Sequence, residues 1–88
     1  MISFDEARAI VAAQQGWDPA QWGWANDEVY VMAYDYGEEP APPGEPELLV
    51  DKRTGELRWV HCSAGQPPAP DLRPVGARST AYRPRWPE

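Results

Sequence analysis

The sequence predicts an α+β fold, with one N-terminal helix packed on a small antiparallel sheet of about three strands and a proline-rich C-terminal tail. Three observations lead to this prediction: a capped helical pattern opens the chain, two runs rich in strand-forming residues follow, and most of the eleven prolines come after Glu39. A chain of 88 residues has room for one domain. We expect this domain to span residues 1–76, and residues 77–88 to form a tail with little regular structure.

The first element is a helix over about residues 4–15. Ser3 and Glu6 have the spacing of a capping box, in which each side chain accepts a hydrogen bond from the backbone amide of the other residue. One stripe of side chains recurs at three- and four-residue spacing, as on one face of a helix: Phe4, Ala7, Ile10, Val11 and Gln14. Gly16 is the expected end of the helix, because glycine readily adopts the left-handed conformation found there. The stripe needs a sheet to cover it.

The next segment has the pattern of a strand. Residues 28–34 alternate between two faces and are rich in β-branched and aromatic side chains, which favours a strand over a helix. Residues 17–27, before this strand, are expected to form a connection with turn chemistry, although they contain three Trp.

The clearest hairpin joins residues 47–51 to residues 56–61. Its short loop carries Gly55 at the position where a positive φ closes the turn. The carboxylate of Asp51 is placed to cap the backbone amides of that turn. Residues 37–46 contain four prolines and two glycines, so we expect a long acidic loop there. Beyond Ser63, prolines and glycines exclude a long element, and Leu72 and Val75 are expected to dock back on the sheet.

Charge is unevenly distributed along a chain with a net charge of −6. Residues 1–51 hold eleven acidic residues and one basic residue, whereas residues 52–88 hold seven basic and three acidic ones. The acidic first half argues against nucleic acid as a partner, because phosphate contacts require Lys and Arg. It favours the basic surface of a protein partner, although acidic residues also serve simply to keep a small domain soluble.

The single cysteine, Cys62, indicates a reducing compartment, because a secreted domain of this size usually carries several disulfides. The segment from Met1 to Glu6 lacks the basic and apolar regions of a signal peptide. No apolar run is long enough to cross a membrane. We therefore expect a cytoplasmic protein without membrane contact.

The residues that commonly carry catalysis are scarce. His61 and Cys62 are the only histidine and cysteine, and neighbours on a strand point to opposite faces, so we expect a solvent-facing His61 and a buried Cys62. Asp35, Glu38 and Glu39 lack the alternate spacing of a calcium loop. We predict that the protein is not an enzyme and uses no cofactor and no metal.

Aromatic residues are more numerous than a core of this size requires, with five Trp and four Tyr. Exposed aromatic side chains surrounded by charge resemble binding hot spots. The residues predicted to bind a partner are Trp22, Trp24, Asp35, Tyr36, Glu38 and Glu39. Trp22 is the best candidate among the indoles, whereas Trp24 is equally compatible with a place in the core and Tyr34 fits the core better than the surface.

The order of these elements resembles the immunity protein 35 family, also called YrhB-like. The matching features are the helix that opens I-S-F-D-E-A-R, a Trp-led strand over residues 24–34, an acidic proline-bearing loop, and the hairpin V-D-K-R-T-G-E. Within the hairpin, Asp51, Lys52, Thr54 and Gly55 match the family pattern. The resemblance covers residues 2–60, and the chain departs from it after Val60, where a proline-rich segment stands in place of a second helix.

This resemblance implies antitoxin-like inhibition. We expect a small immunity-type protein that binds one toxin domain by its acidic and aromatic surface and occludes the active site of that toxin. The alternatives are a chaperone-like stress factor that binds several clients and, as a third hypothesis, a small enzyme. The oligomeric state is left open by the sequence.

Overall fold

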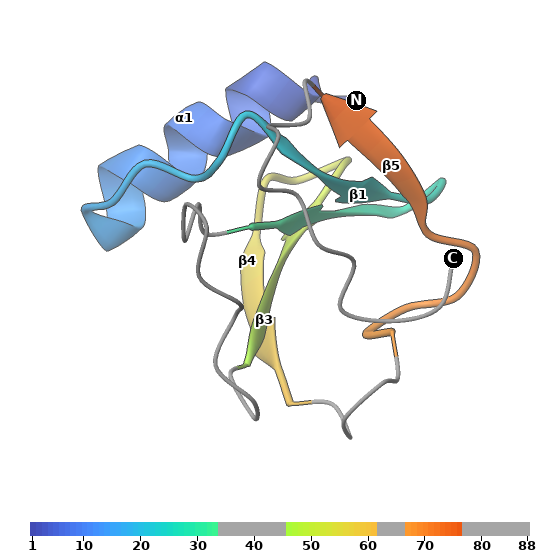
Figure 1. Cartoon of the computed structure of the whole chain (residues 1–88). Coiled ribbons are helices and arrows are strands. Elements are labelled where there is room, and N and C mark those ends of the chain that lie inside the picture. Colours follow the sequence, from blue (N-terminus) through green and yellow to red (C-terminus); the bar gives the residue numbers. More distant parts are fainter. Residues whose placement is uncertain (34–45, 62–66, 77–88) are drawn as a thin grey trace.

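One helix and five short strands make up the fold in the computed structural model of the chain, which describes residues 1–33, 46–61 and 67–76 (Figure 1). In chain order the elements are α1 Phe4–Gln15, β1 Trp22–Ala25, β2 Val29–Met32, β3 Glu47–Asp51, β4 Leu57–Val60 and β5 Arg73–Gly76. The predicted α+β class is confirmed, but the sheet has five strands rather than about three. The predicted loop at 37–46 lies mostly, and the predicted tail at 77–88 entirely, outside the described residues.

The helix forms as the local sequence requires. The Ser3 side chain accepts a hydrogen bond from the amide of Glu6, and the Glu6 side chain accepts one from the amide of Ser3, both at 3.1 Å. At the other end, Gly16 has φ 79° and donates its N–H to the carbonyl oxygen of Ala12. The predicted bounds and both caps are therefore confirmed. Within the described ranges, no helix has the length and apolar character needed to span a membrane.

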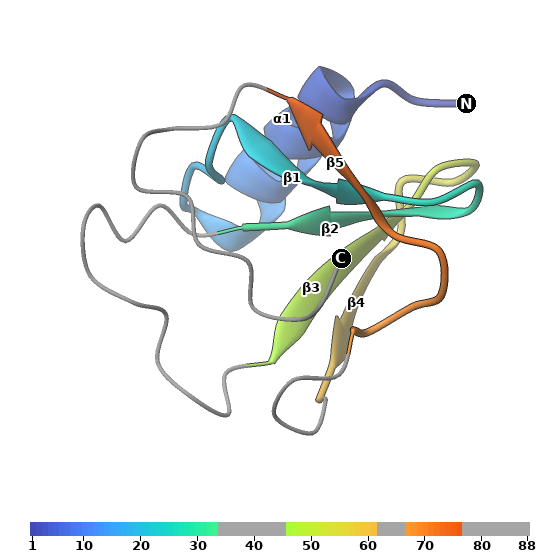
Figure 2. The same cartoon turned by 45° about the vertical axis from the view of Figure 1, so that its right-hand side comes forward.

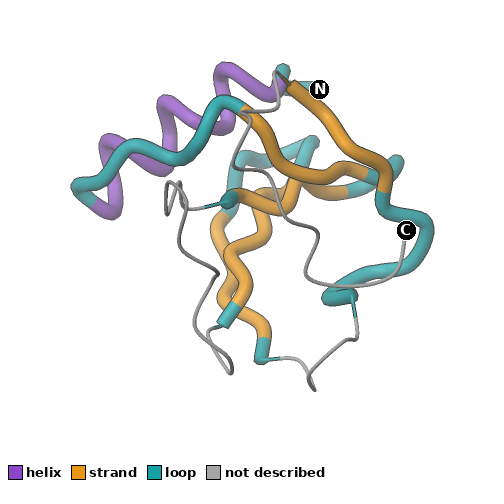
Figure 3. The backbone as a smooth tube through the Cα atoms, viewed as in Figure 1, coloured by secondary structure: helices purple, strands orange, loops and turns teal. Residues whose placement is uncertain are grey.

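The sheet has the strand order β4-β3-β2-β1-β5, and every neighbouring pair is antiparallel. The first four strands form a meander, and β5 then lies beside β1 at the opposite edge from β4 (Figures 1 and 2). Helix α1 packs on one face of this sheet (Figure 2). Figure 3 traces the turns that join β1 to β2 and β3 to β4.

Two strands were not expected. The predicted connection at residues 17–27 contains β1, whose sequence W-G-W-A offers only weak strand signals. A tight turn follows β1, in which the side-chain oxygen of Asn26 accepts from the amides of Glu28 and Val29 at 2.8 and 2.9 Å. This turn sets the start of β2 at Val29. The second unexpected strand is β5, which contains Pro74 and is possible because it pairs on one side only.

The core has two parts, one on each face of the sheet. On the helix face, three residues of α1 meet alternate residues of β2 and β3: Phe4, Ala7, Val11, Tyr30, Met32, Leu48 and Val50. On the opposite face a second cluster is formed by Ala20, Trp22, Trp24, Val31, Ala33 and Leu49. Leu72 packs against the second cluster and Val75 against the first, so both dock on the sheet as predicted.

Candidate protein-binding edge

The two predicted partner-binding indoles lie in the core. Trp22 is 7% exposed and Trp24 is 1% exposed. Their rings meet edge to face, with centroids 5.5 Å apart, on the sheet face opposite the helix. The expectation that Trp22 would be partly exposed is wrong, and Trp24 takes the core position that the sequence left open. The physical reason is β1 itself: once residues 22–25 form a strand inside the sheet, both indoles point to the same covered face.

The other predicted partner-binding residues, Asp35, Tyr36, Glu38 and Glu39, lie outside the described residues, and Tyr34 and Cys62 do so as well. Their predicted roles therefore stay predictions. His61 is described and is exposed, as expected.

The exposed indole of the described chain is Trp59, which the sequence analysis did not select. Trp59 is 45% exposed, and the only other large apolar side chain exposed in the described ranges is Met1. Trp59 lies on β4, at one end of the strand order. Within residues 1–33, 46–61 and 67–76, β4 has a neighbouring strand on one side only, and this position accounts for the exposure of the indole.

The hairpin register shows which backbone groups of β4 face outward. The amide of Asp51 donates to the carbonyl oxygen of Glu56 at 2.9 Å, so these two residues form a hydrogen-bonded pair. Hydrogen-bonded and non-bonded pairs alternate along an antiparallel ladder. Leu57 and Trp59, opposite Val50 and Leu48, are therefore in non-bonded positions. Their N–H and C=O groups point away from β3, toward the open edge.

The opposite edge of the sheet lacks this property. On β5, Pro74 lies opposite Trp24, and Arg73 and Val75 lie opposite Ala25 and Gly23. Since proline has no N–H, position 74 must be one whose backbone does not bond to β1, so it faces outward. The outer edge of β5 is therefore short of donors, as is usual for edges that resist pairing.

The turn that carries β4 is firmly attached to the rest of the domain. The amide of Gly55 donates to the carbonyl oxygen of Asp51 at 2.8 Å, with φ 74° at Gly55, as predicted. The carboxylate of Asp51 accepts from the amides of Arg53 and Thr54 at 2.7 and 3.1 Å, and these bonds lower the pKa of Asp51. The amide of Ile2 donates to the carbonyl oxygen of Lys52 at 2.9 Å. The edge strand thus has a rigid base.

Tyr30 adds a second attachment at the same place. Its hydroxyl donates to the carbonyl oxygen of Ile2 at 3.0 Å, and the ammonium of Lys52 lies 4.8 Å from the centre of its ring. Burial raises the pKa of the Tyr30 phenol, and the nearby carboxylate of Glu6 raises it further. The phenol is therefore protonated at neutral pH and keeps its hydrogen bond.

The charged residue next to Trp59 on β4 is Arg58. Its side chain is exposed and forms no ion pair with another described residue. The acidic residues Asp51 and Glu56 share with Arg58 the lining of a hollow of about 200 Å³ on the face opposite the helix. Arg58 thus offers a guanidinium for a partner to bind.

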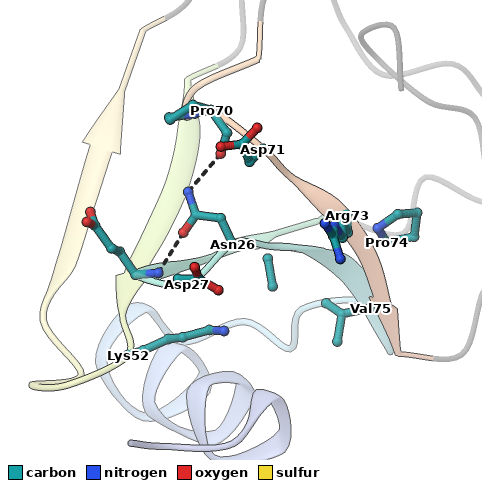
Figure 4. A pocket seen from close by; sticks show the side chains of 10 residues that line it. Asn26, Asp27, Lys52, Pro70, Asp71, Arg73, Pro74 and Val75 are labelled. Carbon is teal, nitrogen blue, oxygen red and sulfur yellow. Dashed lines mark hydrogen bonds between the residues drawn. The ribbon is translucent and has the colours of Figure 1, made fainter.

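A larger cleft lies between the β1–β2 turn and the segment that leads into β5, and Lys52 of the β3–β4 turn also lines it (Figure 4). Its volume is about 520 Å³. The side-chain amide of Asn26 donates to the carbonyl oxygen of Pro70 at 3.0 Å and holds the two walls together (Figure 4). The charged side chains of the lining have both signs: Asp27, Glu28, Asp71, Lys52 and Arg73. This mixture does not select one class of ligand.

Comparisons of the chain with models of protein families, with curated proteins and with solved structures found no match. The resemblance to the immunity protein 35 family therefore stays a prediction from the residues named above.

Proposed function

We propose that the protein is a small immunity-type binding protein, which binds one partner protein, a toxin domain, and occludes the active site of that toxin. The observation that supports this proposal is the exposed Trp59 beside Arg58 on the edge strand β4. Trp and Arg are the residue types most enriched where protein interfaces gain most of their binding energy. Their position on a strand also limits the conformational entropy that binding would cost.

The exposed area of the Trp59 ring sets how much free energy it can contribute to binding. With 45% of its surface exposed, the ring leaves on the order of 100 Å² for a partner to cover. At 25 cal/mol per Å², covering it contributes about 2–3 kcal/mol. That corresponds to roughly a hundredfold in affinity, which is large enough to be measured with one substitution.

The charge distribution supports a basic partner. The net charge of −6 would speed the encounter with a basic toxin surface by electrostatic steering. We propose that Asp35, Tyr36, Glu38 and Glu39 contribute to this contact, and that the protein acts in the cytoplasm. Reversing two of these charges, Glu38→Lys with Glu39→Lys, should slow association and weaken its dependence on salt.

The experiment is a binding measurement with the toxin domain encoded beside the gene for this protein, together with growth rescue when both are co-expressed. Binding of one partner at nanomolar strength and rescue of growth are expected. Trp59→Ala should weaken binding by about ten- to a hundredfold, whereas Gln15→Ala, at an exposed position of α1, should leave it unchanged. Equal affinity of the Trp59 and Gln15 variants, or weak binding of several unrelated clients instead, would contradict the proposal.

A further inference from the structure

We infer that the partner binds by adding an extended strand to the outer edge of β4, and that this strand places a carboxylate opposite Arg58. The inference rests on the proposed function, because it describes how the same surface would hold a protein partner. It goes further by naming the binding mode and the chemistry of the segment that is bound.

The outward-facing backbone groups of β4 suit the addition of a strand. Leu57 and Trp59 direct two N–H donors and two C=O acceptors away from β3, and among the described residues no strand follows β4 in the sheet order. An edge of this kind is a template for another strand, whose main chain supplies the hydrogen bonds while its side chains supply specificity. Leu57 and Trp59 have one residue between them. This is the spacing of successive residues that form hydrogen bonds with the same antiparallel neighbour.

The side chains of β4 specify what the added strand should carry. Residues directly opposite each other in the sheet point to the same face. A residue opposite Trp59 would therefore meet the exposed half of the indole, which favours an apolar side chain. A residue opposite Arg58 would lie on the other face. On β3, the residue directly opposite Arg58 is Leu49, and the nearby Asp51 and Glu56 line the same hollow without forming an ion pair with Arg58. A carboxylate directly opposite Arg58 on the added strand can form one.

The same argument disfavours a second copy of this chain as the occupant. In a two-fold antiparallel pairing centred on Arg58, the two guanidinium groups would lie directly opposite each other, and like charges in this position are destabilising. In a pairing centred on Trp59, Arg58 would lie opposite Val60 and would again lack a carboxylate.

A pairing centred on Leu57 would place Glu56 opposite Arg58, but Trp59 would then lie opposite the turn residue Gly55, whose N–H already donates to the carbonyl oxygen of Asp51. That pairing would therefore be too short to form two hydrogen-bonded pairs. A partner segment with an acidic residue between two apolar ones satisfies both faces of β4.

The opposite edge of the sheet explains why binding would be confined to β4. Pro74 removes a donor from the outer edge of β5. An added strand would find fewer bonds there and no exposed indole, since Trp59 and Met1 are the exposed large apolar residues among those the structure describes.

The test is amide hydrogen exchange by NMR on the full chain, titrated with the acetylated and amidated peptide Thr-Thr-Val-Glu-Val-Thr-Thr. The amides of Leu57 and Trp59 should exchange at least about tenfold more slowly at saturation, because each gains a hydrogen bond. The amides of Arg58 and Val60, which already face β3, should change little. The same peptide with both valine nitrogens methylated should give no protection, because its donors are removed.

Reversing the charge of the peptide or of Arg58 gives a second measurement. Because Arg58 is exposed, its substitution should not disturb the folding of the protein. Replacing glutamate by lysine in the peptide should weaken binding to the natural chain by about two- to fivefold, and R58E should reverse that preference. Unchanged exchange at Leu57 and Trp59 with saturating peptide would overturn the inference. Protection of these amides without peptide, accompanied by dimerisation, would overturn it in favour of a second copy.

The two proposals can fail separately. If toxin binding depends on Trp59 while the peptide leaves the exchange of the Leu57 and Trp59 amides unchanged, strand addition is wrong and the binding function stands. If the peptide protects these amides but no toxin domain binds, the edge accepts strands and the proposed function is wrong.

Discussion

Trp59 lies directly opposite Leu48 in the register of β3 and β4, yet Leu48 is 2% exposed and Trp59 is 45% exposed. Both side chains point to the helix face. Leu48 has β2 and β4 on its two sides, whereas Trp59 has, among the strands that the structure describes, a neighbour on one side only. The position of a strand within the sheet, rather than the hydrophobicity of its residues, therefore decides which of the two is available to a partner.

This pair predicts a contrast in stability. Leu48→Ala should lower the free energy of unfolding by about 2–5 kcal/mol, because it opens a cavity in the core. Trp59→Thr keeps a strand-forming residue and should cost about 1 kcal/mol. Urea denaturation followed by circular dichroism measures both. A larger loss for Trp59→Thr than for Leu48→Ala would show that the ring belongs to the core and would weaken its proposed binding role.

The cap of α1 predicts a second result. Ser3→Ala removes the acceptor for the amide of Glu6 and should lower the free energy of unfolding by about 1 kcal/mol. Ser3→Asp retains an acceptor at the same place and should retain most of the stability. Thermal and urea unfolding of the two variants provide the measurement. An equal loss in both variants is the outcome that would exclude a capping role.

Two glycines with nearly the same backbone conformation predict different costs. Gly16 has φ 79° and Gly76 has φ 81°, so alanine meets a similar strain of about 1–2 kcal/mol at either position. At Gly16 the added Cβ meets nothing within 4 Å, whereas at Gly76 it collides with the carbonyl oxygen of Gln21 and comes within 2.9 Å of the Phe4 ring.

Gly76→Ala should therefore lower the free energy of unfolding well beyond the loss measured for Gly16→Ala in the same denaturation assay. Equal losses would mean that β5 moves away from α1 without cost. In that case the contact between Gly76 and Phe4 would not contribute to holding β5 in place.

The turn of the β3–β4 hairpin predicts a pH dependence. The amides of Arg53 and Thr54 lower the pKa of Asp51 in the folded state. A lowered pKa contributes stability that is present above the pKa of the unfolded chain and is lost as the pH falls through the folded pKa. The contribution of Asp51 should therefore be present at neutral pH and decline in acid.

Asp51→Asn is the matched control, because an amide oxygen accepts the same two hydrogen bonds but does not titrate in this range. The difference in free energy of unfolding between the natural chain and Asp51→Asn should shrink as the pH is lowered below the ordinary range of an aspartate. Denaturation curves at a series of pH values measure it. A difference that stays constant with pH would indicate that the charge of Asp51 makes no contribution.

The features that the sequence predicted correctly depend on residues that are close together in the chain. The capping box of Ser3 and Glu6, the end of α1 at Gly16 and the Asp51 turn each involve groups within four positions of one another. Their geometry is nearly the same in any fold. The candidate site could not be predicted in this way, because the order of strands in the assembled sheet decides which indole is exposed.

The strands β1 and β5 illustrate that limit. Neither W-G-W-A nor R-P-V-G has a strong strand pattern. Each becomes a strand because it pairs with the other, and β1 pairs with β2 as well. Pairing between residues 22 and 76 brings together segments far apart in the chain, and local propensity contains no information about such a contact.

The sequence by itself determined the helix and the hairpin of a small α+β domain, and it showed more aromatic residues than a core of this size requires. Only the tertiary structure decided that the exposed indole of the described residues is Trp59 and that Trp22 is buried. The reason is physical: alternation along a strand assigns each side chain to a face, but the order of strands decides which faces and edges are covered. That order brings β1 inside the sheet and leaves β4 at its edge.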